Sequence, residues 1–277
     1  MGTCPYCKQS AGFLKSLHPE CKQRYERGWQ QIVAKATDAA MGKSPLAGLQ
    51  GALAEIAKTS YLDNSKVKEA LVAGWEAASA LYLEDNIISE AEEETLANYA
   101  KEYGLSQQDL IQHGAYIRVV KGSILREVLN GETPSAVKLN GTIPFNVGKD
   151  EVMIWMEGSI KYMEERTHRT YVGGSQGVSM RIAKGLYYRV GAFKATPVVT
   201  SALEAVDQGN LLITDKAVYF QGAKKSFRIP FTKIVSFLPY SNGMGFFKNT
   251  ANAKQQVIVS GDGWFYYNLV TNLAQRQ

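Results

Sequence analysis

The chain has 277 residues, of which 45% are hydrophobic and 21% are charged, as is ordinary for a soluble globular protein with sizeable cores. It contains no apolar run of 18 residues, so we expect no transmembrane segment, and no secretory hydrophobic stretch follows Met1. With three cysteines that we expect to be reduced, the chain is predicted to be cytoplasmic.

Charge is divided unevenly along the chain. Residues 1–136 carry 14 Lys and Arg against 17 Asp and Glu, a balance of −3. Residues 137–277 carry 17 against 9, a balance of +8. This contrast predicts a domain boundary and places any anionic partner on the C-terminal half.

All three cysteines lie in the first 21 residues, and one histidine joins them in a C-x2-C-x10-H-x2-C pattern made of Cys4, Cys7, His18 and Cys21. Four such ligands suit Zn²⁺ in tetrahedral geometry. His18 and Cys21 stand three residues apart, so both project from one face of a helical turn that begins at Pro19. We predict a structural zinc ion, because four protein ligands leave no coordination position for a reactive water.

The alternatives for this motif are a redox-active Cys-x-x-Cys pair and three unconnected thiols. A thioredoxin-like pair needs a strand before it, and Cys4 stands at the start of the chain. A short turn with two ligands, followed by a helix whose first turn carries the other two, resembles the treble-clef type of zinc module. We assign this module to residues 1–26.

Residues 27–133 are predicted to be helical, with a buried stripe of Trp29, Ile32, Val33 and Ala36 in the first helix. Further helices are expected to start at Ser44-Pro45, after a cap at Asn64 or Ser65, at the Ser89-x-x-Glu92 capping box and at Ser106, the last running as one long helix to Asn130-Gly131. The stretch 83–94, Leu-Glu-Asp-Asn-Ile-Ile-Ser-Glu-Ala-Glu-Glu-Glu, resembles the turn between helices in TerB-like bundles. Its glutamates are expected at a helix N-terminus, which favours carboxylates.

After a linker at 130–135 the periodicity changes from that of helices to that of strands, and residues 137–277 form the third predicted domain. Leu211 and Ile213 alternate on one side of the turn Asp215-Lys216, and Val218 and Phe220 alternate on the other. The end, 263–273, returns to helical spacing through Trp264, Tyr267 and Val270. The fold class predicted is therefore α+β and multidomain: a small zinc module, a helical bundle, and a β-domain with a C-terminal helix.

The β-domain carries two motifs, a Leu-x-x-Thr-Asp-Lys turn at 211–216 and an Ile-Pro-x-x-Lys-Ile strand at 229–234. They resemble the core hairpins of bacterial PH/GRAM-like domains. This resemblance implies a β-barrel or sandwich closed by the last helix, with Trp264 as the candidate aromatic that packs over one end. It also implies a domain that binds proteins more often than lipids.

Residues 173–177, Gly-Gly-Ser-Gln-Gly, match the nucleophile-elbow pattern, but all three histidines precede Ser175, contrary to that motif. We interpret the run as a glycine-rich hairpin loop. We expect His113 in a helical stripe and His168 in a charge cluster at a strand end. The protein is predicted not to be an enzyme.

Basic residues gather on predicted hairpins of the C-terminal half and are candidates for an anion-binding surface: Arg166, Arg169, Arg181, Lys184, Arg189, Lys224, Lys225 and Arg228. The alternative is that half of them face away from one another. We expect a non-enzymatic, zinc-containing binding or adaptor protein that recognises a protein partner through its PH-like domain. Two alternatives remain open, a nucleic-acid-associated protein and a peripheral sensor of anionic membrane lipids.

Overall fold

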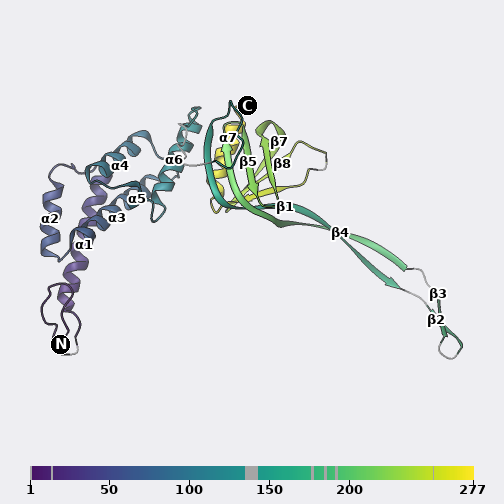
Figure 1. Cartoon of the computed structure of the whole chain (residues 1–277), viewed down its shortest axis with the longest axis horizontal. Coiled ribbons are helices and arrows are strands. Elements are labelled where there is room, and N and C mark those ends of the chain that lie inside the picture. The colour runs from purple at the N-terminus through teal and green to yellow at the C-terminus, as the bar shows by residue number, and fades with distance from the viewer. Residues whose placement is uncertain are drawn as a thin grey trace. The chain divides into compact units, whose positions relative to one another are not determined.

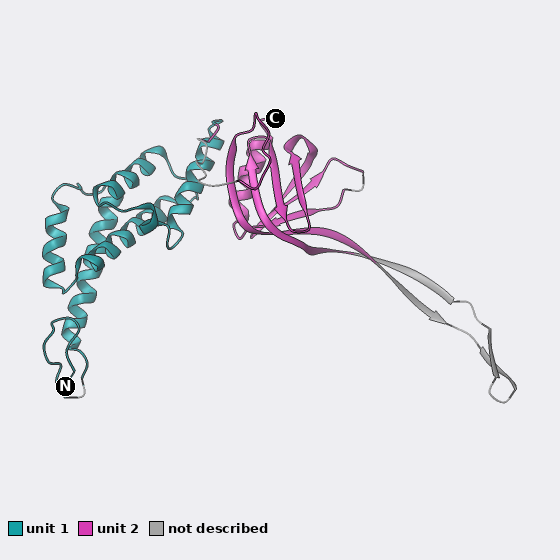
Figure 2. Cartoon of the chain, viewed as in Figure 1, with its two compact units in different colours: residues 1–132 teal, residues 133–277 magenta. Residues whose placement is uncertain are grey.

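The computed structural model describes residues 2–13, 15–134, 143–175, 178–183, 186–190, 193–251 and 253–277, without the side chains of 169–200. The described chain is of the α+β class and divides into two compact units, Met1–Glu132 and Thr133–Gln277 (Figure 2). We call them the N-terminal unit and the C-terminal unit. A separate module of residues 1–26 remains a prediction, since the first helix runs through its boundary.

The described part of the N-terminal unit is helical (Figure 1). Its helices are α1 (Pro19–Ala40), α2 (Leu49–Thr59), α3 (Asn64–Tyr82), α4 (Glu90–Glu102), α5 (Gln107–Leu110) and α6 (Ala115–Leu129). None of the described helices in either unit is both long and apolar enough to cross a membrane.

The core of this unit lies between α1, α3 and α4. The polar atoms that burial brings into it are hydrogen-bonded: the Trp75 indole donates to the Leu96 carbonyl at 3.1 Å, and the Tyr99 hydroxyl donates to the Leu71 carbonyl at 3.1 Å. Helices α1 and α3 pack so closely at Gly74 that a Cβ at this position would clash with Ala36. The helical stripe around Ile32 and Ala36 is therefore confirmed as a buried face.

The starts of two helices are as predicted. Helix α1 begins at Pro19 with His18 as its N-cap. Helix α4 begins with a complete capping box, in which Ser89 N–H donates to Glu92 Oε2 at 2.9 Å and Glu92 N–H donates to Ser89 Oγ at 3.3 Å. Each of these helix starts depends on residues within one helical turn of each other, and contacts with residues far away in the sequence do not change it.

Other helix limits were predicted wrongly. The helix expected at Ser44 begins at Leu49, because Gly48 takes the cap position in a left-handed conformation. The cap of α3 is Asp63, whose carboxylate accepts the Lys66 N–H at 2.9 Å, instead of Asn64 or Ser65.

The long helix expected from Ser106 is broken into α5 and α6. Ser106 and Asp109 form a capping box at the start of α5, and this short helix ends at Leu110. Gly114 then adopts φ +80°, which reverses the backbone before α6 begins. The expectation of one continuous helix is wrong because apolar spacing alone does not register such a turn.

The C-terminal unit is a curled antiparallel sheet with a closing helix (Figure 1). Its elements are β1 (Met153–Ser175), β2 (Val178–Ala183), β3 (Leu186–Val190), β4 (Phe193–Thr214), β5 (Ala217–Gly222), β6 (Ser226–Pro230), η1 (Phe231–Lys233), β7 (Ile234–Tyr240), β8 (Gly243–Lys248), β9 (Gln256–Val259) and α7 (Gly263–Ala274). Seven of the described strands form the main sheet in the order β6-β5-β4-β1-β9-β8-β7, and β2 pairs with β3.

The inner face of the sheet is aromatic. Tyr162, Phe220 and Phe227 meet in one cluster with ring centroids 5.0 to 5.4 Å apart. The predicted pair of strands around the turn Asp215-Lys216 is confirmed, and Leu211, Ile213, Val218 and Phe220 are buried there. Burial does not alternate as the spacing predicts, because Leu212, Ala217 and Tyr219 on the opposite face are buried in a cluster with Phe145 and Val147.

The helix α7 closes the sheet with a different face from the one predicted. Trp264 is 42% exposed, whereas Phe265 and Tyr266 are buried, and the Phe265 ring lies edge-on to Trp155 at 5.2 Å. The Trp155 indole donates to the Tyr266 hydroxyl at 2.9 Å. The resemblance implies an aromatic residue over one end of the sheet, but helical spacing fits both faces of this aromatic-rich helix, so the prediction of Trp264 is wrong.

Two other local predictions need correction. The Ile-Pro-x-x-Lys-Ile run is not a single strand: β6 ends at Pro230, which has no N–H for the ladder, and η1 separates it from β7. Of the glycine-rich run expected as a loop, Gly173–Ser175 belong to β1 and pair with β4, while Gln176 and Gly177 lie outside the described residues.

Candidate metal centre

The first two cysteines lie in a tight reversal of the chain before α1, which we call the knuckle (residues 2–13 and 15–18). An antiparallel bridge joins Thr3 to Ser10, the Cys4 N–H donates to the Gln9 carbonyl at 2.8 Å, and the Lys8 N–H donates to the Cys4 carbonyl at 3.0 Å. Lys8 takes a left-handed φ of +61° within this turn. The turn therefore places Cys4 and Cys7 on the same side.

The other two candidate ligands come from the beginning of α1. His18 is the N-cap and Cys21 lies in the first turn, with its N–H donating to the His18 carbonyl at 3.1 Å. Helix geometry thus fixes this pair, while the knuckle fixes the other pair.

The structure brings all four predicted ligands together. Cys4, Cys7, His18 and Cys21 have ligand atoms that all lie within 4.8 Å of one another. The His18 Nδ1 is 3.3 Å from Cys7 Sγ and 3.8 Å from Cys21 Sγ. A tetrahedral ion with bonds of about 2.3 Å to sulfur and about 2.0 Å to nitrogen separates such atoms by about 3.6 Å. The cysteines are not disulfide-bonded, so the cluster could hold a metal ion.

The orientation of His18 suits this role. Its Nε2 lies 3.0 Å from the Ser10 carbonyl oxygen, which can only accept a hydrogen bond, so Nε2 carries the proton. In the neutral ring the lone pair is then on Nδ1, the atom that faces the sulfurs. A backbone carbonyl that orients a ligating histidine in this way is a recurrent feature of metal sites.

The pKa values of three of the four groups depart from their ordinary values, and not in the same direction. Burial would raise the pKa of Cys4, but backbone N–H donors of His18, Cys7 and Tyr6 lower it to about 6. Burial and the neighbouring Cys7 raise the pKa of Cys21, and the hydrogen bond with Cys7 raises the pKa of His18. A bound dication would stabilise all three thiolates at once, which protons cannot do.

Sequence reasoning missed the residues that support the site from outside. The Tyr61 hydroxyl hydrogen-bonds to Cys21, which raises the pKa of Tyr61. Arg24 Nη1 in turn lies 3.4 Å from that hydroxyl, with its guanidinium over the Tyr61 ring. Tyr6 packs against Tyr25 of α1 with ring centroids 5.0 Å apart. Tyr61 follows α2, forty residues from Cys21, and nothing in the spacing marks it.

The candidate anion-binding residues do not form one described cluster. Arg166 lies 3.7 Å from Glu204, and Lys225 lies 3.3 Å from Glu164. The Lys224 N–H donates to Asp207, and no ion pair of its side chain is seen among the described residues. The side chains of Arg169, Arg181 and Arg189, and the whole of Lys184, lie outside the described part of the chain.

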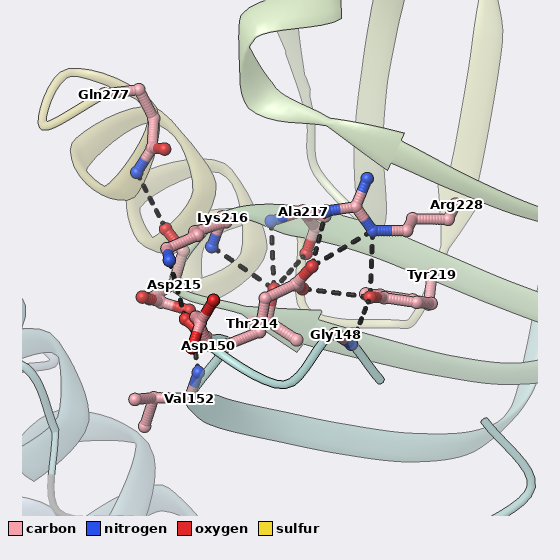
Figure 3. Close-up of polar contacts among 11 residues, drawn as sticks. Gly148, Asp150, Val152, Thr214, Asp215, Lys216, Ala217, Tyr219, Arg228 and Gln277 are labelled. Atoms are coloured by element: carbon pink, nitrogen blue, oxygen red, sulfur yellow. Dashed lines mark hydrogen bonds and ion pairs between the residues drawn. The ribbon is translucent and has the colours of Figure 1, made fainter. Parts of the chain in front are cut away.

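Arg228 belongs to a polar network at the start of the C-terminal unit (Figure 3). Its guanidinium pairs with Glu151, whose carboxylate also accepts the Thr214 hydroxyl at 2.7 Å and the Tyr219 hydroxyl at 3.0 Å. The Glu151 side chain is only 5% exposed. Arg228 is therefore engaged in holding the fold together.

This network anchors residues 143–152, which we call the pre-strand segment, to the β4–β5 turn. The Val152 N–H donates to Asp215 Oδ1 at 2.8 Å, and Lys216 Nζ donates to the Asp150 carbonyl at 2.6 Å (Figure 3). Phe145 and Val147 pack on the same face of the sheet as Tyr219. The Thr-Asp-Lys turn therefore helps to hold the pre-strand segment against the sheet.

The remaining histidines lie in ion-pair geometry. His113 lies in the turn between α5 and α6, not in a helical stripe as expected, and its Nδ1 is 2.8 Å from Glu76 Oε1. His168 Nε2 is 2.5 Å from Glu204 Oε1 across the β1–β4 ladder.

No known protein family matches the sequence, and no curated protein matches it either. The chemistry of the residues themselves therefore carries the functional conclusion.

Proposed function

We propose that Cys4, Cys7, His18 and Cys21 bind one structural Zn²⁺. Support for zinc comes from the ligand set, since three thiolates and one imidazole in a compact cluster are typical of tetrahedral zinc sites. The ion would join the knuckle to α1. Its coordination sphere would be full, so it would supply stability and no reactive position.

On this basis the protein is a non-enzymatic binding or adaptor protein. The single observation that carries the proposal is the convergence of four candidate metal ligands, whose ligand atoms all lie within 4.8 Å of one another. We assign partner recognition to the C-terminal unit, whose motifs resemble those of PH/GRAM-like domains.

A protein partner is favoured over nucleic acid or lipid by the described charges. Arg166, Lys225 and Arg228 each pair with a glutamate, which leaves them less able to bind phosphate groups. The edge strand β7 offers a surface of another kind, because Val235 on it is 66% exposed. Exposed sheet edges accept an added strand from a partner.

The test is affinity capture with the full chain, followed by mass spectrometry, in three versions of the protein. Val235→Asp should abolish recovery of the partner that the wild type retains. Gln275→Asp introduces the same charge on an exposed residue of the C-terminus and should leave recovery unchanged. Equal recovery by all three versions would reject the β7 edge.

The two alternative functions give distinct outcomes with the same protein. A nucleic-acid-associated protein would bind duplex DNA or RNA with an affinity that falls steeply as salt rises. A sensor of anionic lipids would sediment with phosphatidylserine vesicles and not with phosphatidylcholine vesicles. Either result, obtained together with no specific protein partner, would replace our proposal.

A further inference from the structure

The two longest strands of the C-terminal unit, β1 and β4, continue beyond the main sheet as a two-stranded ribbon (Figure 1). The β1–β9 ladder ends at Glu164, and the β4–β5 ladder ends at Gly209. From the pair of Thr167 and Ser201 outward, nine consecutive residue pairs join only β1 and β4 within the described residues. The strands β2 and β3 also pair only with each other there. We call the described residues of the range 167–203 the arm.

The sequence range of the arm accounts for the whole formal net charge of the protein. Residues 167–203 contain no aspartate or glutamate, whereas the other 240 residues contain 26 basic and 26 acidic residues. The formal net charge of the chain, +5, is therefore that of five residues: Arg169, Arg181, Lys184, Arg189 and Lys194. Because the range has no carboxylate of its own, neighbours along its strands do not neutralise these cations, and the arm is suited to an anionic partner.

The strand register distributes the basic residues over both faces of the arm. Arg169 and Lys194 lie on opposite faces of the β1–β4 ladder, since residues directly opposite each other share a face and successive residues alternate. Arg181 and Arg189 share one face of the β2–β3 ladder. The β1–β4 part therefore has no face without a cation.

This arrangement separates the candidate occupants. A second copy of the arm is excluded by charge, because two ribbons that both carry only cations repel each other. A membrane surface needs one apolar face along the ribbon, which the β1–β4 ladder lacks. A nucleic acid duplex places phosphates on both sides of an element that lies in its groove, so cations on both faces suit it.

The dimensions of the arm favour DNA over RNA. The major groove of B-form DNA, about 12 Å wide, admits a two-stranded β-ribbon, whereas that of A-form RNA is too narrow for protein side chains. Nine residue pairs at about 3.4 Å each span about 30 Å, close to one turn of B-form DNA, about 34 Å. A two-stranded ribbon alone is at best marginally stable in water, so contacts along its length would also stabilise it.

We propose that the arm binds duplex DNA by lying along the major groove, where its lysines and arginines neutralise phosphates. Such contacts give affinity with little dependence on base sequence. The cations that pair with glutamates, Arg166, Lys225 and Arg228, take no part. The DNA contact is additional to the proposed protein partner and uses neither the β7 edge nor the metal.

Fluorescence anisotropy of a labelled 20-base-pair duplex of mixed sequence, titrated with the full chain between 50 and 200 mM salt, tests the proposal. Five phosphate contacts predict that the logarithm of the association constant falls with the logarithm of the salt concentration with a slope of about −4.5. An RNA duplex of the same sequence should bind more weakly. Absence of DNA binding, an affinity independent of salt, or equal affinity for the RNA duplex would overturn the proposal.

Two double variants locate the contact. Arg169→Gln combined with Lys194→Gln should reduce the steepness of the salt slope by about 2 and weaken binding at 0.1 M salt by roughly tenfold per cation. Lys35→Gln combined with Lys58→Gln removes the same charge from exposed positions of the N-terminal unit and should change neither quantity. Equal affinities of the two variants would show that the arm is not the binding site. Retention of the far-ultraviolet circular dichroism of the wild type excludes misfolding as the cause of a loss.

Sedimentation with phosphatidylserine vesicles tests the competing surface. The face of β2–β3 opposite Arg181 is apolar in sequence, with Val178, Met180 and Tyr188. Sedimentation that the arm variant abolishes, together with no DNA binding by the wild type, would replace DNA by a lipid surface. Val235→Asp should leave the affinity for DNA unchanged, so failure of this proposal and failure of the β7 edge give different results.

Discussion

The knuckle and the pre-strand segment are both irregular in structure, and the structure holds them in different ways. The knuckle has a very small core of Cys4, Ala11 and Cys21, so its order depends on the four candidate metal ligands. The pre-strand segment is held by Glu151, whose carboxylate accepts bonds from three side chains, and by the apolar contacts of Phe145 and Val147. The comparison teaches that one chain holds irregular backbone with a cluster of candidate metal ligands in one unit and with a buried charge network in the other.

The largest expected effect comes from Cys21→Ser. Loss of one thiolate leaves an incomplete coordination sphere, so the knuckle should lose its protection from hydrogen exchange, and bound zinc should fall well below one per chain. The C-terminal unit should keep the exchange protection of the wild type, because it has its own core. Loss of protection throughout the chain would contradict the independence of the two segments.

The matching change in the C-terminal unit is Glu151→Ala. It leaves Arg228, Tyr219 and Thr214 without their shared acceptor and should lower the free energy of unfolding of that unit by about 3 kcal/mol. Hydrogen exchange of the backbone amides of β4 and β5, measured at increasing urea concentrations, reports this change for the C-terminal unit alone. Glu204→Ala removes a more exposed carboxylate, 37% exposed, and serves as the control with a smaller effect. Zinc content should be unchanged in both variants.

A fall in pH should remove the stabilisation that the Glu151 network gives to the C-terminal unit. Burial alone would raise the pKa of Glu151, but hydrogen bonds from Thr214, Arg228 and Tyr219 lower it below its usual value. A lowered pKa in the folded state means that this stabilisation is present above the unfolded pKa of about 4.3 and is lost as the pH falls through the folded value. Glu151→Gln should therefore flatten the decline of stability between about pH 5 and pH 3. A decline as steep as that of the wild type would contradict this assignment.

The smallest effect expected is that of Tyr61→Phe. This change removes only the hydroxyl that bonds to Cys21, and loss of an outer partner of a metal ligand weakens metal affinity about tenfold. Competition with a chromogenic chelator measures the change. Tyr82→Phe, on α3 and outside the contacts of the metal centre, should leave affinity unaltered.

The parts of the structure that the sequence predicts correctly depend on residues close together in the chain. The four ligands are all within 18 residues, and the capping box at Ser89 acts over three residues. The strands predicted on either side of Asp215 likewise form a single hairpin. When residues are close together in the sequence, their spacing alone determines how their side chains lie relative to one another.

The parts that could not be predicted depend on contacts between distant residues. Glu151 meets Thr214 and Arg228 across 63 and 77 positions, and Tyr61 meets Cys21 across 40. The glutamates opposite Arg166 and Lys225 come from other strands, so a count of basic residues overstates the charge that is available to a ligand. The choice between Trp264 and Phe265 was decided by packing against Trp155, which periodicity does not encode.

X-ray absorption at the zinc edge, together with elemental analysis of metal-replete full-length protein, tests the central claim most directly. We predict one zinc per chain, bound by three sulfurs at about 2.3 Å and one nitrogen at about 2.0 Å. Absence of bound metal, a shell of oxygens, or cysteines joined in a disulfide would contradict the proposal of a knuckle held by a structural ion.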